Sequence, residues 1–367
     1  MVRIGPRWAI VATTDTSRPY IDGRIDPVRS RSFLLNIVGL AVIVGLSGFS
    51  RSFAAEELPW LVSPVPAVPA VPAAPTMPDW LQAHVGEGDG KIAPVVLQRA
   101  RALYLKKVSE GAVKNPCYFA VDATRPAGLG RRFYVICEAD RTFRVLPTGH
   151  GNGRNLKGIA NFANGIRCAK NFSNALDSKL TTGGPYVTAE IKTSFKGYYR
   201  APGGKKLPMM RSFVQFDGEG DTANARPRAI GGHPAVIVSW LCRMKAPGDP
   251  NADDEEYVPY GKLIDYSAGR SNGCTSWSPA DAKQILAKVE DRPTTLYIYP
   301  ESSDIVAVAR EAKAGRSLSK AGLYWNASCL KEIRVPNFWP RETLEPALMK
   351  LRKDNPPAEP KPLPKCR

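Results

Sequence analysis

Short runs of strand-forming residues, separated by turn residues, fill the middle of this 367-residue chain and constrain its fold more than any other feature. The runs are rich in β-branched and aromatic residues, which favour strands over helices. They occupy residues 117–121, 132–137, 142–146, 185–193, 212–216, 235–240 and 295–299. Many short strands with few helices predict a mostly β fold with a barrel-like or sandwich-like core and a few peripheral helices.

Two segments carry helical signals instead. Apolar residues recur at helical spacing over residues 92–110, which predicts an amphipathic helix packed onto the domain that follows. A second helix is predicted at 279–289, because Ser278 is a favourable N-cap and a proline stands at the first helical position. Residues 305–353 are expected to add helices at the periphery, and the acidic stretch 249–256 is expected to be a surface loop.

The N-terminal region carries the signals of an exported protein. Arginines precede an uncharged apolar run at 33–49, and residues 52–54 follow it with the small-x-small pattern of a signal-peptidase site. The run is slightly shorter than the ~20 residues that span a bilayer comfortably. We therefore expect residues 1–55 to be a cleaved signal peptide, with an N-terminal membrane anchor as the alternative.

Proline recurs at nearly every third position over residues 59–78. Proline fixes φ and removes an amide donor, so this segment is expected to be an extended polyproline-type spacer. Residues 56–90 are accordingly interpreted as a linker, and His84 within them as a solvated surface histidine. The tail from residue 355 onward is also rich in proline and is expected to be extended.

The chain is strongly basic, with a formal net charge of +17. Long-range attraction from such a charge concentrates polyanions near the protein. Export argues against nucleic acid as the partner and leaves anionic wall or membrane polymers. The expected location is the periplasm or cell envelope, with anchoring through residues 33–49 as the alternative to release.

Seven cysteines fit an oxidising compartment, and their odd number leaves at least one thiol outside any intramolecular disulfide. If Cys274 is that thiol, the other six allow up to three disulfides, and the sequence does not select a pairing. An equally open alternative is that several of the six are buried free thiols. The six are at positions 117, 137, 168, 242, 329 and 366.

Cys274 ends the run Gly-Arg-Ser-Asn-Gly-Cys at 269–274. A thiol is an effective acyl acceptor when a base or cation assists its ionisation and amide N–H groups hold the developing oxyanion. A tight turn through Ser271 and Gly273 would direct successive amides toward one acyl oxygen. Taken alone, the pattern is also typical of a structural cysteine that follows a glycine turn.

Two of the three histidines lie in glycine-flanked segments. His150 precedes Gly-Asn-Gly, and His233 follows two glycines. Glycine permits close backbone approach to a ligand, so both segments are typical of loops at a functional site. Metal hydrolysis through His150, His233 and Cys274 would have the right atom types. No His-x-x-x-His or paired-cysteine spacing accompanies them, so neither a metal nor a cofactor is expected.

The order of these motifs resembles the catalytic domain of the L,D-transpeptidase (YkuD-like) family, in particular its murein L,D-transpeptidase branch. Residues 269–274 are similar to that branch's Gly-Arg-Ser-x-Gly-Cys signature, and residues 148–153 to its His-Gly-x-Gly loop. Residues 171–186 and 224–233 are similar to two weaker family segments. The resemblance runs, in the right order, over residues 117–300.

The resemblance implies a β-rich catalytic domain at 91–304 with an N-terminal helix, followed by a C-terminal extension and proline-rich tail at 305–367. It implies that Cys274 attacks a peptidoglycan tetrapeptide stem, releases the terminal D-alanine and forms a thioester. An amine on a neighbouring stem would then take the acyl group and form a cross-link. An L,D-carboxypeptidase or endopeptidase would pass the same thioester to water.

The resemblance also assigns roles by position. His233 is the general base or imidazolium partner of Cys274, and Ser271 orients the histidine. The amides of Gly273 and Cys274 form the oxyanion pocket. The candidate substrate-binding residues are His150, Asn272, Arg228 and Arg270.

Three places depart from the family pattern and bear on substrate choice. Pro234 replaces a glycine after the histidine, Asn272 replaces a larger residue before Gly273, and Thr275 begins a pair that is apolar in that branch. The expected partners are peptidoglycan stem peptides. An alternative from another class is a non-catalytic wall-binding protein that has kept the fold and the basic surface.

Overall fold

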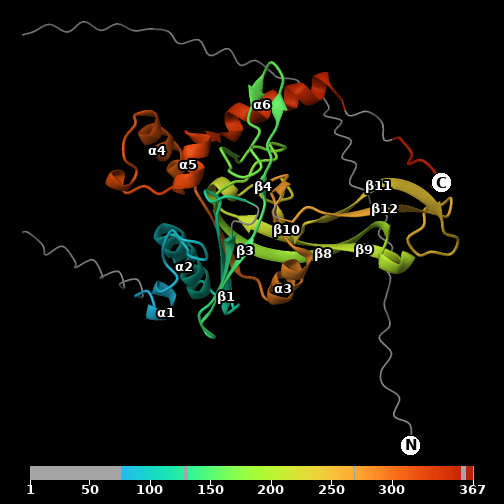
Figure 1. The fold of residues 1–367 in the computed structure, drawn as a ribbon, viewed down its shortest axis with the longest axis horizontal. Coiled ribbons are helices and arrows are strands. Elements are labelled where there is room, and N and C mark those ends of the chain that lie inside the picture. The colour runs from blue at the N-terminus through green and yellow to red at the C-terminus, as the bar shows by residue number, and fades with distance from the viewer. Residues whose placement is uncertain (1–75, 128–130, 268, 357–360, 367) are drawn as a thin grey trace, which may run out of the picture. The chain divides into compact units, whose positions relative to one another are not determined.

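The computed structural model describes residues 76–127, 131–267, 269–356 and 361–366, which belong to one compact unit. Strands dominate this part of the chain and six α-helices accompany them, so the prediction of a mostly β fold is confirmed. The strands form one large mixed sheet and three small sheets (Figure 1).

The large sheet consists of β1 (Cys117–Asp122), β2 (Arg131–Cys137), β3 (Thr142–Pro147), β8 (Gly184–Arg200), β9 (Lys206–Gly218), β10 (Gly231–Pro234), β11 (Val236–Lys245), β12 (Tyr257–Asp265), β14 (Thr275–Trp277) and β15 (Thr295–Tyr299). Its main path follows the order β14-β10-β9-β8-β15-β1-β2-β3. Strand β12 pairs in parallel with β8 and antiparallel with β11. The pairs β10–β14 and β1–β15 are also parallel, so the sheet is mixed.

Three two-stranded sheets stand beside it. They pair β13 (Arg270–Ser271) with β4 (His150–Gly151), β16 (Asn337–Trp339) with β7 (Asn171–Ser173), and β5 (Asn155–Leu156) with β6 (Ala160–Asn161). The first of these sheets brings together two loops that the sequence analysis singled out separately.

The helices are α1 (Asp79–Gln82), α2 (Pro94–Ser109), α3 (Pro279–Val289), α4 (Ser302–Lys313), α5 (Ala327–Ile333) and α6 (Arg341–Asp354). Helices α2 and α3 confirm the two helices predicted from sequence. Ser278 caps α3 as expected, because its side chain accepts a hydrogen bond from the Asp281 N–H. Helices α4 to α6 confirm the helical additions after residue 305, and residues 249–256 lie in the connection between β11 and β12.

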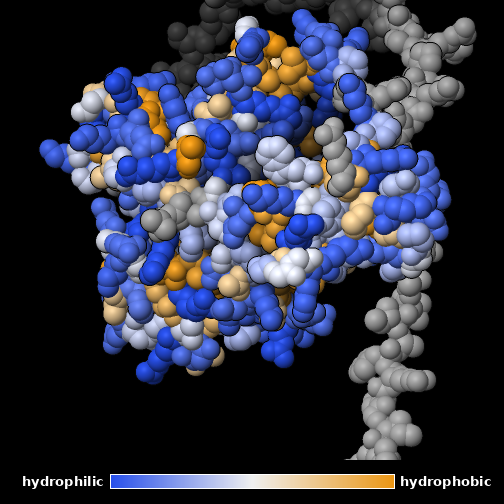
Figure 2. Space-filling model, turned by 45° about the vertical axis from the view of Figure 1, so that its right-hand side comes forward, coloured by the Kyte–Doolittle hydropathy of each residue, from blue (hydrophilic) through white to orange (hydrophobic). Residues whose placement is uncertain are grey.

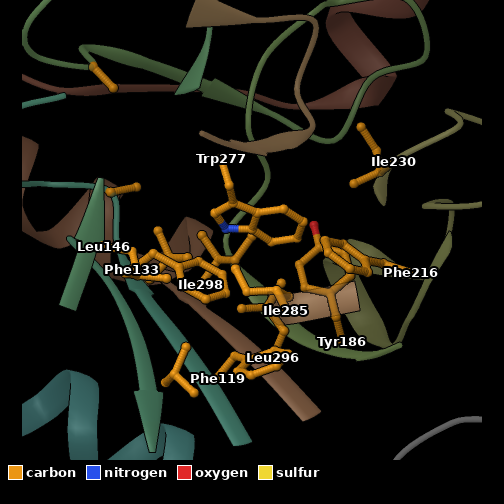
Figure 3. Close-up of a cluster of buried hydrophobic side chains, with 14 of the residues drawn as sticks. Phe119, Phe133, Leu146, Tyr186, Phe216, Ile230, Trp277, Ile285, Leu296 and Ile298 are labelled. Carbon is orange, nitrogen blue, oxygen red and sulfur yellow. The ribbon is translucent and has the colours of Figure 1, made fainter. Parts of the chain in front are cut away.

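Both faces of the large sheet are covered where β1 and β2 run, because successive side chains of a strand point to opposite sides. Phe133 belongs to a core that also contains Ile285 of α3, whereas the neighbouring Tyr134 packs with residues of α2. Figure 3 shows the first of these cores, in which Trp277 of β14 lies over the side chains around Ile285. Strand β14, and with it the end of the Cys274 turn, is thereby fixed to the core.

Three disulfides join Cys117 to Cys137, Cys168 to Cys329, and Cys242 to Cys366. Cys274 is the free cysteine. The structure thus decides between the two alternatives that the sequence left open, in favour of disulfides over buried free thiols. Three intramolecular disulfides indicate an oxidising, exported location.

The segments at the two ends of the predicted catalytic domain pack against it. Leu81 of α1 is fully buried, so the predicted 56–90 linker is folded in its described part. His84 is half-buried and stacks on Phe143, with 4.2 Å between ring centroids, and the expectation of a solvated histidine is wrong. In the C-terminal extension, Ile305 belongs to the same core as Trp277.

The predicted signal peptide or anchor at 1–55, including the apolar run 33–49, lies outside the described residues. Within the described ranges, no helix combines the length and apolar character needed to cross a membrane. The face of the molecule drawn in Figure 2 is mostly hydrophilic, and its apolar residues gather in small separate patches.

Candidate active site

Cys274 and His233 are brought together by the pairing of two short parallel strands. Strand β14 begins directly after Cys274 and pairs with β10, in which His233 lies opposite Ser276. Both Cys274 and His233 line one cavity of about 780 Å³. Forty residues lie between them in the sequence, and the sheet brings both to the lining of one cavity.

The glycines before His233 allow this arrangement. A Cβ atom on Gly232 would lie 2.1 Å from the Trp277 ring, so only glycine lets β10 pass this close to the buried indole. Trp277 is 1% exposed and belongs to the main hydrophobic core. The strand that carries His233 is therefore seated against the strand that follows Cys274.

The turn before Cys274 depends on Gly273, whose φ of +109° is disfavoured for residues with a side chain. The Ser271 hydroxyl forms hydrogen bonds with two backbone groups of this turn. It donates to the Cys274 carbonyl oxygen at 2.6 Å and accepts from the Gly273 N–H at 3.1 Å. The Cys274 thiol thus projects from a turn whose backbone is held by two hydrogen bonds to the Ser271 hydroxyl.

These contacts change two of the expected roles. Ser271 was expected to orient the histidine, but its hydroxyl bonds to Gly273 and Cys274 of its own turn. Gly273 was expected to offer its amide to an oxyanion, but that N–H already donates to Ser271. Both residues therefore shape the turn before Cys274, and the Cys274 amide is the remaining expected oxyanion donor.

The Cys274 thiol is uncharged at rest. Burial raises the pKa of the thiol above its ordinary value, and the Gly231 N–H and the guanidinium groups of Arg211 and Arg228 oppose that rise. The Sγ–H donates to the Ala229 carbonyl oxygen at 3.4 Å. Because the net shift is upward, ionisation of this thiol needs a base at the moment of reaction.

His233 has the protonation state of a base. Burial and the neighbouring Arg211 lower its pKa to about 4, so the imidazole is neutral at pH 7. Its Nδ1 lies 2.8 Å from the Arg211 guanidinium and 2.9 Å from the Pro234 carbonyl oxygen. The resting imidazole therefore carries a lone pair and no charge, which is the state from which a general base starts.

His150 does not line the cavity and is not placed to bind substrate. Only 1% of it is exposed, and its two ring nitrogens are engaged by the Arg132 guanidinium and the Gly165 carbonyl oxygen, each at 3.0 Å. Its backbone pairs with Arg270 in the small β4–β13 sheet. The His150 loop therefore supports the strand that leads into the Cys274 turn.

The burial of His150 predicts a loss of stability in acid. Burial, and then the charges of Arg132 and Arg270, lower its pKa from 6.5 to about 3. The stability that neutral His150 provides is complete above pH 6.5. It declines as pH falls toward 3, because in that range the unfolded chain binds a proton at this residue and the folded chain does not. As pH falls, the free energy of unfolding should decrease in both the native protein and His150→Gln. The decrease should be larger in the native protein, by about 1.4 kcal/mol per pH unit. Urea unfolding at pH 6.0 and pH 5.0 measures both slopes, and parallel slopes would contradict the prediction.

The other three predicted substrate-binding residues do line the cavity. Asn272 and Arg270 are exposed at its wall, and Arg270 also donates to the Asn164 carbonyl oxygen at 3.1 Å. The Arg228 guanidinium donates hydrogen bonds to the Thr182 hydroxyl and to the Leu180 carbonyl oxygen. Its guanidinium is therefore fixed beside the Cys274 turn.

Sequence reasoning missed the part of the cavity lining that the β8–β9 hairpin supplies. Lys192, Ser194 and Lys196 alternate along β8, and they share a face with their cross-strand neighbours Phe213 and Arg211. The period-two spacing of polar residues was visible in the sequence. That spacing could not be interpreted without knowing that this face of the hairpin lines the same cavity as Cys274.

The cavity is strongly cationic. The described residues that line it include no Asp or Glu, and five of them are basic. These are Lys192, Lys196, Arg211, Arg228 and Arg270. Such a wall favours a ligand that carries carboxylates or other anionic groups.

Within the described part of the chain, no group of three or more His, Cys, Asp or Glu residues is arranged to hold a metal ion. Comparison of the chain with models of known protein families, with curated proteins and with solved structures found no match.

Proposed function

We propose that this protein is an exported cysteine acyltransferase of the cell wall, a murein L,D-transpeptidase that acts on peptidoglycan tetrapeptide stems. The observation that carries the proposal is that the free cysteine, Cys274, lines a cationic cavity together with a neutral histidine. The motif order along the sequence supports it. In this proposal the large mixed sheet corresponds to the barrel-like or sandwich-like core of that family.

The proposed reaction begins with a neutral thiol and a neutral imidazole. His233 takes the Sγ proton as sulfur attacks the carbonyl carbon of the diamino acid, beyond its L-centre. The negative charge on the carbonyl oxygen faces the Cys274 N–H. When the C–N bond breaks, the imidazolium returns the proton to the leaving D-alanine amine, and a thioester remains.

The second half of the reaction reverses these steps. The side-chain amine of a neighbouring stem attacks the thioester carbon, and His233 takes the proton that the amine loses. The C–S bond then breaks, and the proton returns to sulfur. A water molecule in place of the amine would release a free carboxylate, which is the carboxypeptidase or endopeptidase alternative.

The charge of the cavity supports this substrate class. Peptidoglycan stems end in carboxylates, and a wall of lysines and arginines without acidic neighbours attracts them. The same proposal places the protein in the periplasm or cell envelope, with wall or membrane polymers as weaker anionic partners. The residues that would bind the stem are Arg228, Arg270, Asn272 and the hairpin residues of β8 and β9.

Intact-mass analysis tests the proposal. The mature, disulfide-bonded protein is incubated with a carbapenem or with a purified tetrapeptide muropeptide, and it should gain one acyl group. Cys274→Ala should gain none, because no other thiol is free among the described cysteines. Products formed with an added amine, compared with products formed in water alone, identify the acceptor.

Two outcomes would contradict the proposal. Acylation that persists in Cys274→Ala would show that the nucleophile is another residue. Binding of the native protein to sacculi without any acylation would favour the non-catalytic wall-binding alternative instead.

A further inference from the structure

The Nδ1 atom of His233 faces two partners that it cannot satisfy together. A guanidinium N–H of Arg211 points to it from 2.8 Å, and the Pro234 carbonyl oxygen lies 2.9 Å away. Arginine only donates, and a carbonyl oxygen only accepts. In a neutral imidazole, Nδ1 holds either a lone pair for Arg211 or a hydrogen for Pro234.

The choice between these partners decides whether His233 can act as a base. Both contacts are made at Nδ1, so the proposed reaction leaves Nε2 to take the proton of Cys274. When Nδ1 accepts from Arg211, the ring proton is on Nε2, which then has no lone pair for that proton. When Nδ1–H donates to Pro234, the lone pair is on Nε2. Only the second tautomer is competent in the proposed reaction.

No carboxylate among the described residues of the cavity lining pairs with Arg211. Its contacts in the described structure are neutral, namely His233 Nδ1 and the Tyr266 hydroxyl at 3.0 Å. The described cavity wall contains no carboxylate that would hold the guanidinium in its place. A guanidinium prefers a carboxylate to a neutral acceptor, because the opposite charges attract and two parallel N–H···O bonds can form.

We propose that Arg211 links the binding of a substrate carboxylate to the tautomer of His233. In the empty cavity Arg211 holds Nδ1 as an acceptor. A carboxylate that enters the cavity binds the Arg211 guanidinium in place of His233. The ring proton then moves to Nδ1, which donates to the Pro234 carbonyl oxygen, and Nε2 becomes the base. This inference rests on the proposed function for the reaction that the base serves, but the tautomer change itself requires no catalysis.

His150 provides an internal comparison. There too an arginine, Arg132, points to Nδ1 from 3.0 Å, but the carbonyl oxygen of Gly165 lies at Nε2 instead. The two contacts are compatible and fix one tautomer, with the proton on Nε2. His233 differs because its carbonyl partner competes with the arginine for the same nitrogen.

Nitrogen NMR of the ¹⁵N-histidine-labelled, disulfide-bonded protein at pH 7 tests the proposal, with acetate as the carboxylate probe and acetamide as its neutral match. Without acetate, His233 Nδ1 should give the signal of an unprotonated nitrogen. Acetate should convert it to a protonated nitrogen, acetamide should not, and His150 should stay unchanged with both.

Two variants make the experiment specific. In Arg211→Gln, His233 should already carry its proton on Nδ1 and should not respond to acetate. Lys205→Gln removes the same charge at an exposed position beside β9 and should respond like the native protein. The proposal is overturned if native His233 keeps one tautomer when acetate is added to saturation, if acetate does not bind, or if Arg211→Gln still responds.

A kinetic measurement separates this inference from the proposed function. With native protein, a tetrapeptide stem that has a free terminal carboxylate should acylate Cys274 about 10–100-fold faster than its terminal amide, and Arg211→Gln should lose that preference. If no stem acylates the protein, the proposed function fails while the NMR result stands. If stems acylate equally with and without the carboxylate, the function stands and the role of Arg211 fails.

Discussion

Replacing His233 by asparagine should slow the acylation of Cys274 by about 10²–10⁴-fold, the usual contribution of a general base. The substitution is chosen for its geometry. An asparagine amide reaches the position of Nδ1 and offers both a donor and an acceptor there, so the contacts to Arg211 and Pro234 have a replacement. No atom of asparagine takes the place of Nε2.

The acylation rate is measured by intact mass against time, and thermal unfolding checks that the fold is kept. His84→Asn is the matched control, because His84 packs on Phe143 and does not line the cavity. It should acylate at the native rate. A His233→Asn variant that also keeps the native rate would remove His233 from the mechanism.

Replacing Gly273 by alanine should slow acylation by about 10²-fold, the cost of a displacement near 1 Å at the reacting atoms. The new Cβ would lie 2.8 Å from the Leu180 carbonyl oxygen and 3.0 Å from the Ile230 side chain. Its φ of +109° is also unfavourable for alanine. The turn must therefore shift, and Cys274 shifts with it.

Titration of the free thiol would show that Cys274 is still present and reduced in this variant, while intact mass gives its acylation rate. Gly248→Ala is the control, because Gly248 also has a positive φ of 74° but a Cβ there meets nothing within 4 Å. A Gly273→Ala protein that acylates within about threefold of the native rate would mean that the turn tolerates the displacement.

Much of the fold could be predicted from apolar pattern and turn chemistry. The cap at Ser278 and the strand at 295–299 agree with the structure, because local rules decide buried strands and capped helices. The β8–β9 hairpin is longer than its apolar segments predicted, and β12 was not expected. Both extend into polar sequence, where backbone pairing continues without the side-chain alternation that sequence reasoning uses.

The candidate site could be predicted only where its residues come in recognisable motifs. Cys274 and His233 were found because glycine turns mark them, and the structure places both on the same cavity. His150 is also next to glycines, but these glycines are needed for close packing of the backbone. A Cβ on Gly151 would lie 2.5 Å from the backbone of Lys179. Arg211 has no motif, since its role depends on a strand pairing that the sequence does not display.

The upward-shifted pKa of the Cys274 thiol has a consequence for the life of the protein outside the cytoplasm. Sulfenic acid formation and mixed-disulfide formation both start from thiolate, so a thiol that stays protonated at neutral pH reacts slowly with oxidants. The other six cysteines are already oxidised as disulfides. The burial that raises the pKa of Cys274 thus also protects its thiol from oxidation in an oxidising compartment.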